Sequence, residues 1–393
     1  MNVDGRLTPL EIAASIVFGR DAGAAQLSPT ELQPRAALER ALLDALAEPP
    51  CLVSYSGGRD SSALLALAVH VARRSGLPAP VPITARYAQS GATEESSWQE
   101  LTVRHLNIDE WIVRTFDDEV DLVGPTATEL MTRRGLPYPY NLHLQAPLIA
   151  EATGGTFVTG LGGDEAFLPA PRALAVLTGA VPPRARDVLV VAAAVAPRAL
   201  RRMWFERTQS ISFPWLRPEA NRRLTSAAID EALRQPLRWD RALREWWRTR
   251  YLQMTMANIT EIGAACGVRV RHPFTDPEVV SALATAGGAG GFRNRSSALA
   301  ALFGDVLPPE VPSRADKATF DAVLWNTHSR AFVRDVLSDA QALEAVLERA
   351  GLLDVVDPAR LLDHWRNPHP QANSFLLLQA CWLTWRNAAP ARG

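Results

Sequence analysis

A glycine-rich turn between an apolar run and a helical pattern constrains the fold of this chain more than any other stretch. Residues 52–55 are apolar enough for a short buried strand, and the turn at residues 56–60 follows directly. Ser61 and Ser62 are good N-cap residues, and the Ala, Leu and Val residues after them recur at helical spacing to about Arg74. A glycine and then a proline follow, as expected where a helix ends. The sequence therefore predicts a strand, a tight turn and a helix in immediate succession.

This arrangement predicts a phosphate-binding turn. Free backbone N–H groups and the positive end of the helix dipole would point to one spot, and Gly57 and Gly58 leave no Cβ in the way of a phosphate. The expected hydroxyl donors are Ser54, Ser56, Ser61 and Ser62. Asp60 is anionic, so beside phosphates we expect it to hold Mg²⁺. The alternative interpretation is a glycine turn in an ordinary α/β protein.

Composition excludes several other classes of protein. The chain has 393 residues, 47% hydrophobic and 21% charged, which is typical of a globular protein with one large domain or two smaller ones. A net charge of −1 gives no electrostatic argument for a nucleic acid partner. The three cysteines are scattered without a CxxC pair, so neither a disulfide framework nor a thiolate zinc site is expected. The longest apolar run, residues 188–196, is too short for a bilayer and no signal peptide is visible, so we expect a cytoplasmic protein without a membrane partner.

Strand and helix patterns alternate after the glycine turn. Strands are expected at residues 81–87, 110–116 and 156–159, and helices at residues 94–106, 119–134 and 143–152. Such alternation predicts an α/β fold with a parallel twisted sheet and flanking helices. The carboxyl ends of parallel strands meet at one edge, so the loop at residues 160–165, GLGGDE, should lie beside the glycine turn.

Three regions are expected along the chain. They are two N-terminal helices packed on the core at residues 1–48, a nucleotide-binding α/β region at 49–168 and a mostly helical part at 169–393. Helices outside the α/β region are expected at residues 7–18, 28–47, 187–196 and 240–265. Ser28 and Glu31 have the spacing of a capping box for the second of these helices.

The glycine turn SGGRDS at residues 56–61 resembles the SGGxDS signature of PP-loop ATP pyrophosphatases, which cleave ATP between its α and β phosphates. The loop GLGGDEAF at residues 160–167 narrows the resemblance to the synthetase domain of asparagine synthetases. This resemblance implies that Asp60 and Asp164 hold Mg²⁺ on the pyrophosphate side of ATP. It also implies that Gly162 and Gly163 belong to the nucleotide site, although the acids that follow them are also compatible with a solvated loop.

Two further motifs of that family follow in the same order. Residues 268–279, VRVRHPFTDPEV, resemble the family's E-x-R-x-PFLD motif, except that Arg269 stands where the family has a glutamate near the reacting amide nitrogen. The base for the amine is therefore open, with Glu261 and His272 as the nearest candidates. Residues 307–320, LPPEVPSRADKATF, resemble the segment that carries the family's phosphate-binding lysine. That lysine falls at Lys317, the only lysine among 41 basic residues.

The resemblance implies an ATP-dependent synthetase that joins a carboxylate to an amine or ammonia through an acyl-adenylate, releasing AMP and pyrophosphate. Asp60, Asp164 and Lys317 would be its catalytic residues, and ATP and Mg²⁺ its cofactors. The expected reactants are a small-molecule or peptide carboxylate and an amine, with a separate protein as one source of the amine or peptide. The glutaminase domain of asparagine synthetases has no room before the first motif, so no glutamine hydrolysis is expected.

Other functions stay open from the sequence alone. The family's relatives include β-lactam synthetases and lasso-peptide macrolactam cyclases, so an intramolecular cyclase in natural-product biosynthesis is the first alternative. A tRNA-thiolating PP-loop enzyme is a second, but it would be expected to show cysteine pairs and a basic face, which this sequence lacks. A catalytically inactive ATP-binding scaffold is a third, suggested by Arg269, although the intact Asp60, Asp164 and Lys317 argue against it.

Overall fold

The computed structural model describes residues 7–88, 95–167, 171–177, 179, 181–185, 187–314, 321–366 and 374–388. Five strands form its central sheet: β1 (Cys51–Ser54), β2 (Val81–Tyr87), β3 (Ile112–Phe116), β4 (Thr156–Val158) and β5 (Arg269–Arg271). All neighbouring strands are parallel, in the order β3-β2-β1-β4-β5. The expected α/β class with a parallel sheet is therefore confirmed.

Both faces of the sheet are buried, which explains the apolar character of its short strands. Leu52 of β1 pairs with Phe157 of β4, and both side chains join a core that also contains Ile259 of α13 (Arg250–Ala265). Their neighbours Val53 and Val158 face the other way, into a core formed with α3 (Arg59–Ser75). Alternation along each strand thus supplies two apolar layers from one sheet.

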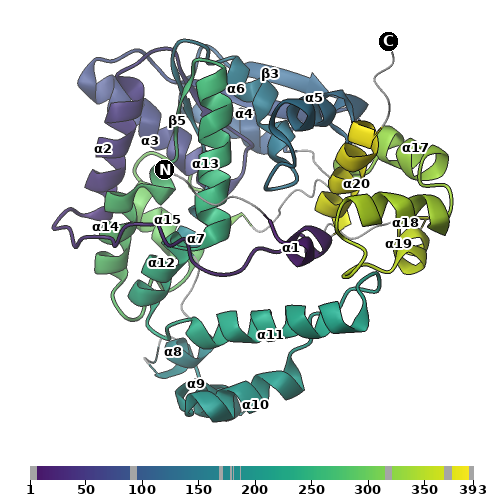
Figure 1. Ribbon diagram of the computed structural model, residues 1–393. Helices are drawn as coiled ribbons and strands as arrows, with labels where there is room; N and C mark the ends of the chain where they lie inside the picture. The colour runs from purple at the N-terminus through teal and green to yellow at the C-terminus, as the bar shows by residue number, and fades with distance from the viewer. Residues whose placement is uncertain are drawn as a thin grey trace.

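Helices cover both faces of the sheet and extend beyond it (Figure 1). The other helices are α1 (Pro9–Ala14), α2 (Pro34–Leu46), α4 (Ser96–His105), α5 (Pro125–Arg134), α6 (Ala146–Ala150), α7 (Gly163–Ala166), α8 (Arg172–Leu177), α9 (Asp187–Val195), α10 (Arg198–Thr208), α11 (Pro218–Arg234), α12 (Trp239–Trp247), α14 (Pro277–Gly287), α15 (Arg295–Phe303), α16 (Asp321–Leu324), α17 (Thr327–Asp335), α18 (Ala340–Arg349), α19 (Pro358–Arg366) and α20 (Phe375–Ala388). Short 3₁₀ turns occur at η2 (Asp118–Val120), η3 (Leu142–Leu144), η4 (Pro273–Thr275) and η5 (Val311–Ser313). Helices α2 and α3 pack on one face, and α6 and α13 on the other.

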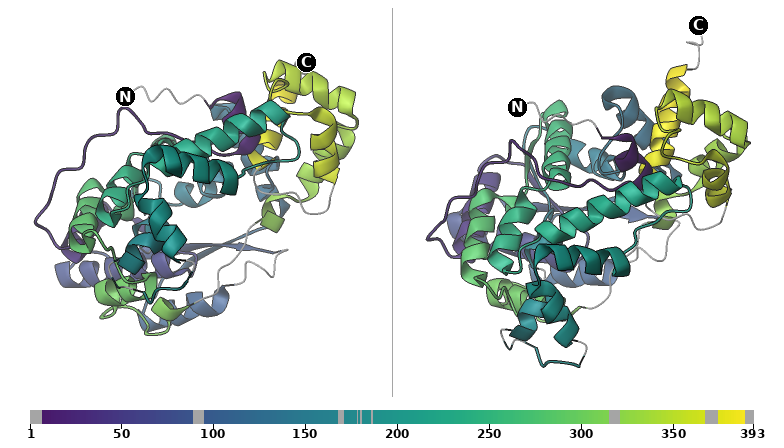
Figure 2. Two further views of the ribbon diagram at one scale, coloured as in Figure 1. Left: turned by 90° about the horizontal axis from the view of Figure 1, so that it is seen from below. Right: turned by 60° about the horizontal axis from the view of Figure 1, so that its bottom comes forward.

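The helices of the C-terminal end form a second packed group with the N-terminal helix (Figures 1 and 2). Helix α1 contacts α20, and the indole of Trp215 donates a hydrogen bond to the carbonyl oxygen of Ala13 at 2.9 Å. Helices α8 to α11 lie at the bottom of Figure 1, away from the sheet. Among the described residues, no helix combines the length and the apolar character that crossing a membrane requires.

The strand order places a reversal of winding direction between β1 and β4. The chain passes from β1 outward through β2 to β3, and then returns to the other side of β1 to form β4 and β5. In open parallel sheets, ligands bind at the carboxyl edge where such a reversal occurs. The two glycine loops follow β1 and β4, so both lie at this point.

Two helices do not begin at the serines where the sequence predicts their starts, namely Ser61 with Ser62 and Ser28. Helix α3 begins at Arg59 with Gly58 as its N-cap, two residues before the expected serine pair. Helix α2 begins at Pro34, which suits the first helical position because it has no N–H to satisfy. The capping box expected at Ser28 is absent from the start of α2, where the N-cap is Gln33 and makes no side-chain cap hydrogen bond. A capping box does occur at the start of α1, between the N-cap Thr8 and Glu11. Helix α1 is also shorter than expected, ending at Ala14.

The single helix expected at residues 240–265 is wrong, because it is divided into α12 and α13. At the break, Thr249 forms an antiparallel bridge with Arg20, which is distant in the chain. The carbonyl oxygen of Arg248 accepts a hydrogen bond from the Asp21 N–H at 2.9 Å, and the Arg250 N–H donates to Gly19 at 3.1 Å. Strand β5 is not expected from the sequence, because its partner strand β4 lies more than a hundred residues earlier.

Candidate functional site

Two loops meet at the carboxyl edge between β1 and β4. After β1 the chain turns through Gly57, with φ of 88°, and enters α3 at Arg59. After β4 it turns through Gly162, with φ of 89°, and enters α7. A Cβ on Gly163 would lie 2.6 Å from Cγ of Asp60, so glycine is required for the two loops to approach this closely. The two turns that the sequence predicts to share a site are therefore in contact.

Arg295, at the start of α15, joins the carboxylates of the two loops. Its Nη1 donates to Oδ1 of Asp164 at 2.5 Å, and its Nη2 donates to Oδ2 of Asp60. The Asp60 side chain is only 14% exposed, whereas that of Asp164 is 53% exposed. Oδ1 of Asp60 is buried and has no hydrogen-bond partner among the described residues. A cationic group thus lies between the two carboxylates that are expected to hold Mg²⁺.

The electrostatics of this cluster follow from burial and from charge. Burial raises the pKa of Asp60, and the nearby Asp164 adds to that effect, although the hydrogen bond and charge of Arg295 oppose it. Burial alone would lower the pKa of Arg295, but its contacts with both carboxylates outweigh burial and raise it. Burial also lowers the pKa of Arg59, with repulsion from Arg295 as the next cause. The cluster therefore strongly favours a cation between its two acids.

A cavity of about 490 Å³, which we call the edge cavity, opens beside these carboxylates. Of the predicted site residues, those that line it are Ser54, Ser56, Gly58, Asp60, Ser61 and Asp164. Those that do not line it are Gly57, Ser62, Gly162 and Gly163. Ser62 is fully buried, so its hydroxyl lies in the core and not at the cavity wall. Ile83 and Ala85 of β2, with Leu142 and Leu148, give the cavity an apolar side.

Hydrogen bonds within the glycine turn hold its shape. Oγ of Ser61 lies 3.1 Å from Oγ of Ser56 and donates to the carbonyl oxygen of Gly58 at 3.1 Å. The Gly58 N–H donates to Oγ of Ser56 at 3.2 Å, so it is already engaged and not free as expected from sequence. Gln99 of α4 supports the turn from outside, donating to the carbonyl oxygen of Ser56 at 2.9 Å.

Arg314 fastens the segment after η5 to the glycine turn. Its side chain is 3% exposed, and Nη1 donates to the carbonyl oxygen of Gly57 at 2.6 Å. Nη2 forms an ion pair with the equally buried Glu95, and the guanidinium lies 5.1 Å from the ring centre of Trp98. Three polar or aromatic contacts in a buried setting make this a strong anchor. Lys317, three residues further along the chain, lies outside the described residues.

The family model for asparagine synthase matches residues 33–385 of the 393-residue chain. The chain belongs to the asparagine synthase family. Members of this family are ATP-dependent ligases, with Mg²⁺ as the customary companion of ATP. A search of curated proteins finds none that matches the chain. The matched residues run from just before α2 into α20, so they contain both loops and the edge cavity.

Position 269, where this member of the asparagine synthase family departs from the expected motif, lies away from the site. Arg269 is the first residue of β5 and pairs in register with Thr156, the first residue of β4. It forms ion pairs with Glu48 at 3.0 Å and Asp44 at 3.7 Å. Because both glycine loops follow the last residues of their strands, Arg269 is at the opposite end of the sheet.

Neither candidate base lines the edge cavity. Glu261 has a side chain 67% exposed on α13 and pairs with Arg134 at 3.3 Å. His272 follows β5 at the correct edge, with Nδ1 2.6 Å from Oγ1 of Thr159, which does line the cavity. Burial lowers the pKa of His272 to about 4, so its imidazole is neutral at physiological pH. His272 is therefore a structural support of the cavity wall, and Glu261 is a surface residue.

Arg295 and Arg314 are two residues of the site for which the sequence predicts no role. Arg295 follows Asn294, which forms a capping box with Ser297, and this local signal marks a helix start without any indication of a distant partner. Its contacts with Asp60 and Asp164 span 235 and 131 residues of sequence. Arg314 lies in the segment at residues 307–320 that resembles the family's lysine-bearing motif, but the spacing of residues does not predict its burial against Glu95.

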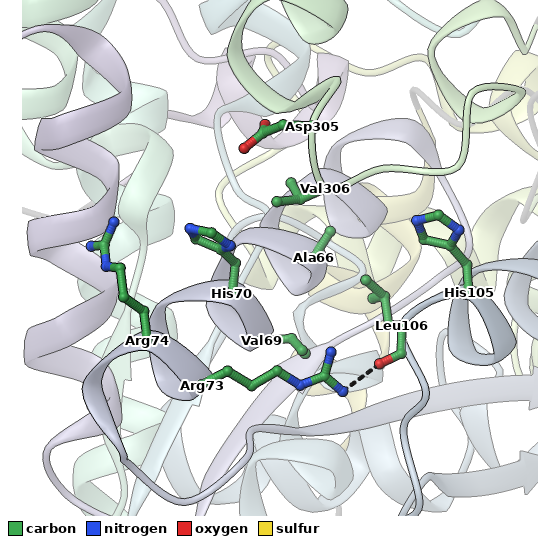
Figure 3. Close-up of a pocket in the computed structure, with 9 residues that line it drawn as sticks. All are labelled: Ala66, Val69, His70, Arg73, Arg74, His105, Leu106, Asp305 and Val306. Atoms are coloured by element: carbon green, nitrogen blue, oxygen red, sulfur yellow. Dashed lines mark hydrogen bonds between the residues drawn. The ribbon is translucent and has the colours of Figure 1, made fainter.

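A groove of about 510 Å³ on the far part of α3 does not take part in this site (Figure 3). His70, Arg73 and Arg74 line it together with His105 and Asp305. The Arg73 guanidinium is engaged by the carbonyl oxygen of Leu106 at 2.5 Å. His70 follows Asp60 by ten residues, or about 15 Å along a helix, so the groove is remote from the two loops.

Proposed function

We propose that this chain is an amide-bond-forming synthetase that activates a carboxylate as an acyl-adenylate and transfers the acyl group to an amine, without hydrolysing glutamine. One observation carries the proposal. Asp60 and Asp164, which come from the loops after two adjacent strands, both contact the single guanidinium of Arg295 beside the edge cavity. The family membership adds ATP-dependent ligase chemistry to this arrangement.

The residues present fit a bound Mg²⁺. Magnesium is commonly held by one or two carboxylates together with phosphate oxygens of the substrate. No group of three or more His, Cys, Asp or Glu side chains gathers as metal ligands in the part of the chain that the structure describes. One carboxylate oxygen of Asp60 is buried and has no partner among the described residues, which leaves it available as a metal ligand. With the metal there, Arg295 would be released to contact the phosphates, and the metal would withdraw charge from the leaving pyrophosphate.

The edge cavity suits a nucleotide on two sides. Its apolar side, made by Ile83, Ala85 and Leu142, would take the adenine ring, and the glycine turn would take the phosphates. An oxygen of the substrate carboxylate attacks the α-phosphorus, and the bond to the bridging oxygen of pyrophosphate breaks. The amine nitrogen then attacks the acyl carbon, the bond to AMP breaks, and one proton leaves the nitrogen. The protein contributes mainly orientation and fixed charge to both steps.

We propose that Lys317 stabilises the negative charge that develops on the leaving pyrophosphate. The buried anchor of Arg314 supports this assignment, because three residues of chain span at most about 10 Å. Lys317→Ala should lower pyrophosphate release on the order of 100- to 1,000-fold, because it removes a fixed cation from the reacting phosphates. The melting temperature should stay within about 2 °C of the wild type, because a polar side chain at a site contributes little to the core.

The fate of α-labelled ATP tests the proposal. The wild-type protein is incubated with Mg²⁺ and pools of small acids, amines and peptides, and nucleotide products are separated beside those of Lys317→Ala. AMP and pyrophosphate from the wild type alone are expected, and the mass of the product separates intermolecular amides from an internal lactam. ADP and phosphate, or equal AMP from the variant, would contradict the proposal. Binding of Mg-ATP without turnover by any pool would favour a scaffold.

A further inference from the structure

A second cavity, of about 720 Å³, lies among α11, α12, the first turn of α13 and the chain after α1. We call it the aromatic cavity, because its walls include Phe18, Tyr138, Trp239, Trp246 and Tyr251. It is larger than the edge cavity of about 490 Å³. None of its aromatic residues belongs to a motif of the family resemblance.

The aromatic cavity shares a wall with the edge cavity. In three pairs of residues that are close in the chain, one residue lines the edge cavity and the other lines the aromatic cavity. Asp164 lines the edge cavity and Glu165 the aromatic cavity, and Pro139 and Tyr138 are divided in the same way. One turn of α13 separates Thr255, at the edge cavity, from Tyr251, at the aromatic cavity. The short helix α7, which carries Asp164 and Glu165, therefore borders both cavities.

Acidic groups dominate the charge of the aromatic cavity. Its charged lining consists of Glu165, Glu231, Glu245 and Arg20. Arg20 is already paired, with Glu245 at 3.1 Å and more closely with Glu231. Arg248, which is not in the lining, adds a contact with Glu245 at 3.8 Å. The carboxylates therefore outnumber the guanidiniums near them.

Among the described residues, the lining has one carboxylate without an ion pair and one carboxylate oxygen without a hydrogen bond. The first is Glu165, whose carboxylate accepts hydrogen bonds from the Tyr251 hydroxyl at 3.2 Å and from its own backbone N–H. Oε2 of Glu231 is buried and has no hydrogen-bond partner there. A buried carboxylate oxygen without a donor is costly unless a ligand or water supplies one. Aromatic faces beside such oxygens are the usual surroundings of a bound ammonium group.

We propose that the aromatic cavity binds the amine that accepts the acyl group, as a primary ammonium carried on an apolar or aromatic body. This inference rests on the proposed function. The cavity is too large for ammonia alone, because a molecule of that size occupies about 30 Å³. Its acidic lining disfavours the carboxylate reactant, which meets Arg59 and Arg295 at the edge cavity instead. The ammonium gives one proton to a carboxylate of this lining, and the neutral amine then reaches the acyl group past the segment that carries Asp164 and Glu165.

Titration calorimetry with three probes of one shape tests this inference. The probes are phenethylamine, 2-phenylethanol and phenylacetate, which are cationic, neutral and anionic, and phenylalanine amide serves as the model of a peptide amino terminus. Phenethylamine should bind at least tenfold more tightly than 2-phenylethanol, and phenylacetate should not bind in this cavity. Tighter binding of phenylalanine amide than of phenethylamine would assign the amine to a peptide, and the reverse order to a small molecule. Equal affinities for the charged and neutral probes would overturn the inference.

Two variants locate the binding. Ala242→Phe, at the cavity wall, should weaken phenethylamine binding at least tenfold, and Ala345→Phe is the matched control because Ala345 is exposed on α18. Glu231→Gln keeps the shape and removes charge, so it should weaken binding three- to tenfold even if Ala242→Phe fails to fold. Mg-ATP affinity should stay within twofold in both cavity variants. If the wild type converts no Mg-ATP to AMP and pyrophosphate, the proposed function is refuted. If amine binding is unchanged in both variants, only this inference is refuted.

Discussion

The edge cavity and the aromatic cavity both border the segment that carries Asp164 and Glu165, but they differ in the parts of the protein that form their walls. The edge cavity is formed largely by short turns at strand ends, with glycines where the backbone approaches closely and serines that bond within the turn. The aromatic cavity is formed by residues of α11, α12 and α13 together with residues 15–20, Tyr138, Glu165 and Pro171. The shape of the edge cavity therefore depends on local backbone geometry, and the shape of the aromatic cavity depends on packing between distant parts of the chain.

This difference indicates how the two cavities can vary. A glycine turn that must touch another loop tolerates few substitutions, because even one Cβ on Gly163 meets Asp60. A cavity lined by Trp239, Trp246 and Phe18 can change shape through side-chain substitutions without disturbing the sheet. We therefore expect ATP chemistry to be set by the edge cavity and the choice of amine by the aromatic cavity.

The largest expected effect separates the two cavities by function. Asp60→Asn should lower pyrophosphate release on the order of 1,000-fold, because several kcal/mol of metal-dependent charge stabilisation are lost. Phenethylamine affinity should remain within twofold, because Asp60 does not line the aromatic cavity. Radiolabelled nucleotide assays and calorimetry on the same preparation measure both. A parallel loss of amine binding would show that the cavities act as one.

The anchor of the edge cavity should matter more to stability than any residue of the aromatic cavity. Arg314→Met leaves Glu95 buried without its partner, so the free energy of unfolding should fall by about 3 kcal/mol or more. Urea unfolding followed by circular dichroism measures the change. Adding Glu95→Leu should recover most of it, because the remaining charge is then removed. A single variant as stable as the wild type would contradict the role of the anchor.

Acid should weaken the wall of the edge cavity through His143. This residue is fully buried in η3, with Nε2 2.8 Å from the carbonyl oxygen of Val120, and burial lowers its pKa from 6.5 to about 4. Between these values the unfolded chain binds more protons, so the stability contribution is present above pH 6.5 and is lost as pH falls toward 4. From pH 7 to pH 5 the loss should be about 2 kcal/mol. Urea unfolding of His143→Gln should show a correspondingly smaller pH dependence, and an identical slope would contradict this account.

The smallest expected effect concerns the contact between the two loops. Gly163→Ala should weaken Mg-ATP binding about tenfold, because its methyl group displaces the Asp60 carboxylate. Gly290→Ala is the control, since a Cβ there meets no atom within 4 Å and its φ is ordinary. Calorimetric titration with Mg-ATP compares the two variants. Equal Mg-ATP affinities of the two variants would contradict the view that Mg-ATP binding depends on the observed position of Asp60.

The sequence was sufficient for features set by neighbouring residues. Strand β2, the glycine stop of α3 at Gly76 and the positions of both loops were predicted correctly, because apolar runs and glycines act locally. The parallel sheet followed from alternation, and β3 and β4 were found with shifted ends. These elements also position most of the predicted residues around the edge cavity.

Features set by distant contacts could not be predicted. The division of α12 from α13 depends on residues 19–21, which supply hydrogen bonds to the broken turn. Strand β5 has three residues and is recognised only through its pairing with β4. Arg295 reaches the two carboxylates across the fold, and the lining of the aromatic cavity comes from seven parts of the chain. The predicted regional boundaries and the role of Lys317 stay predictions.

A crystal structure of the protein with Mg²⁺, α,β-methylene-ATP and phenethylamine tests the central claim most directly. The account predicts phosphates at the glycine turn, the metal between Asp60 and Asp164, and Arg295 moved from its bridging position to the phosphates. It also predicts the amine nitrogen beside Glu165 and Glu231 in the aromatic cavity. Phosphates bound away from the turn, or an amine seated in the edge cavity, would contradict the division of labour between the two cavities.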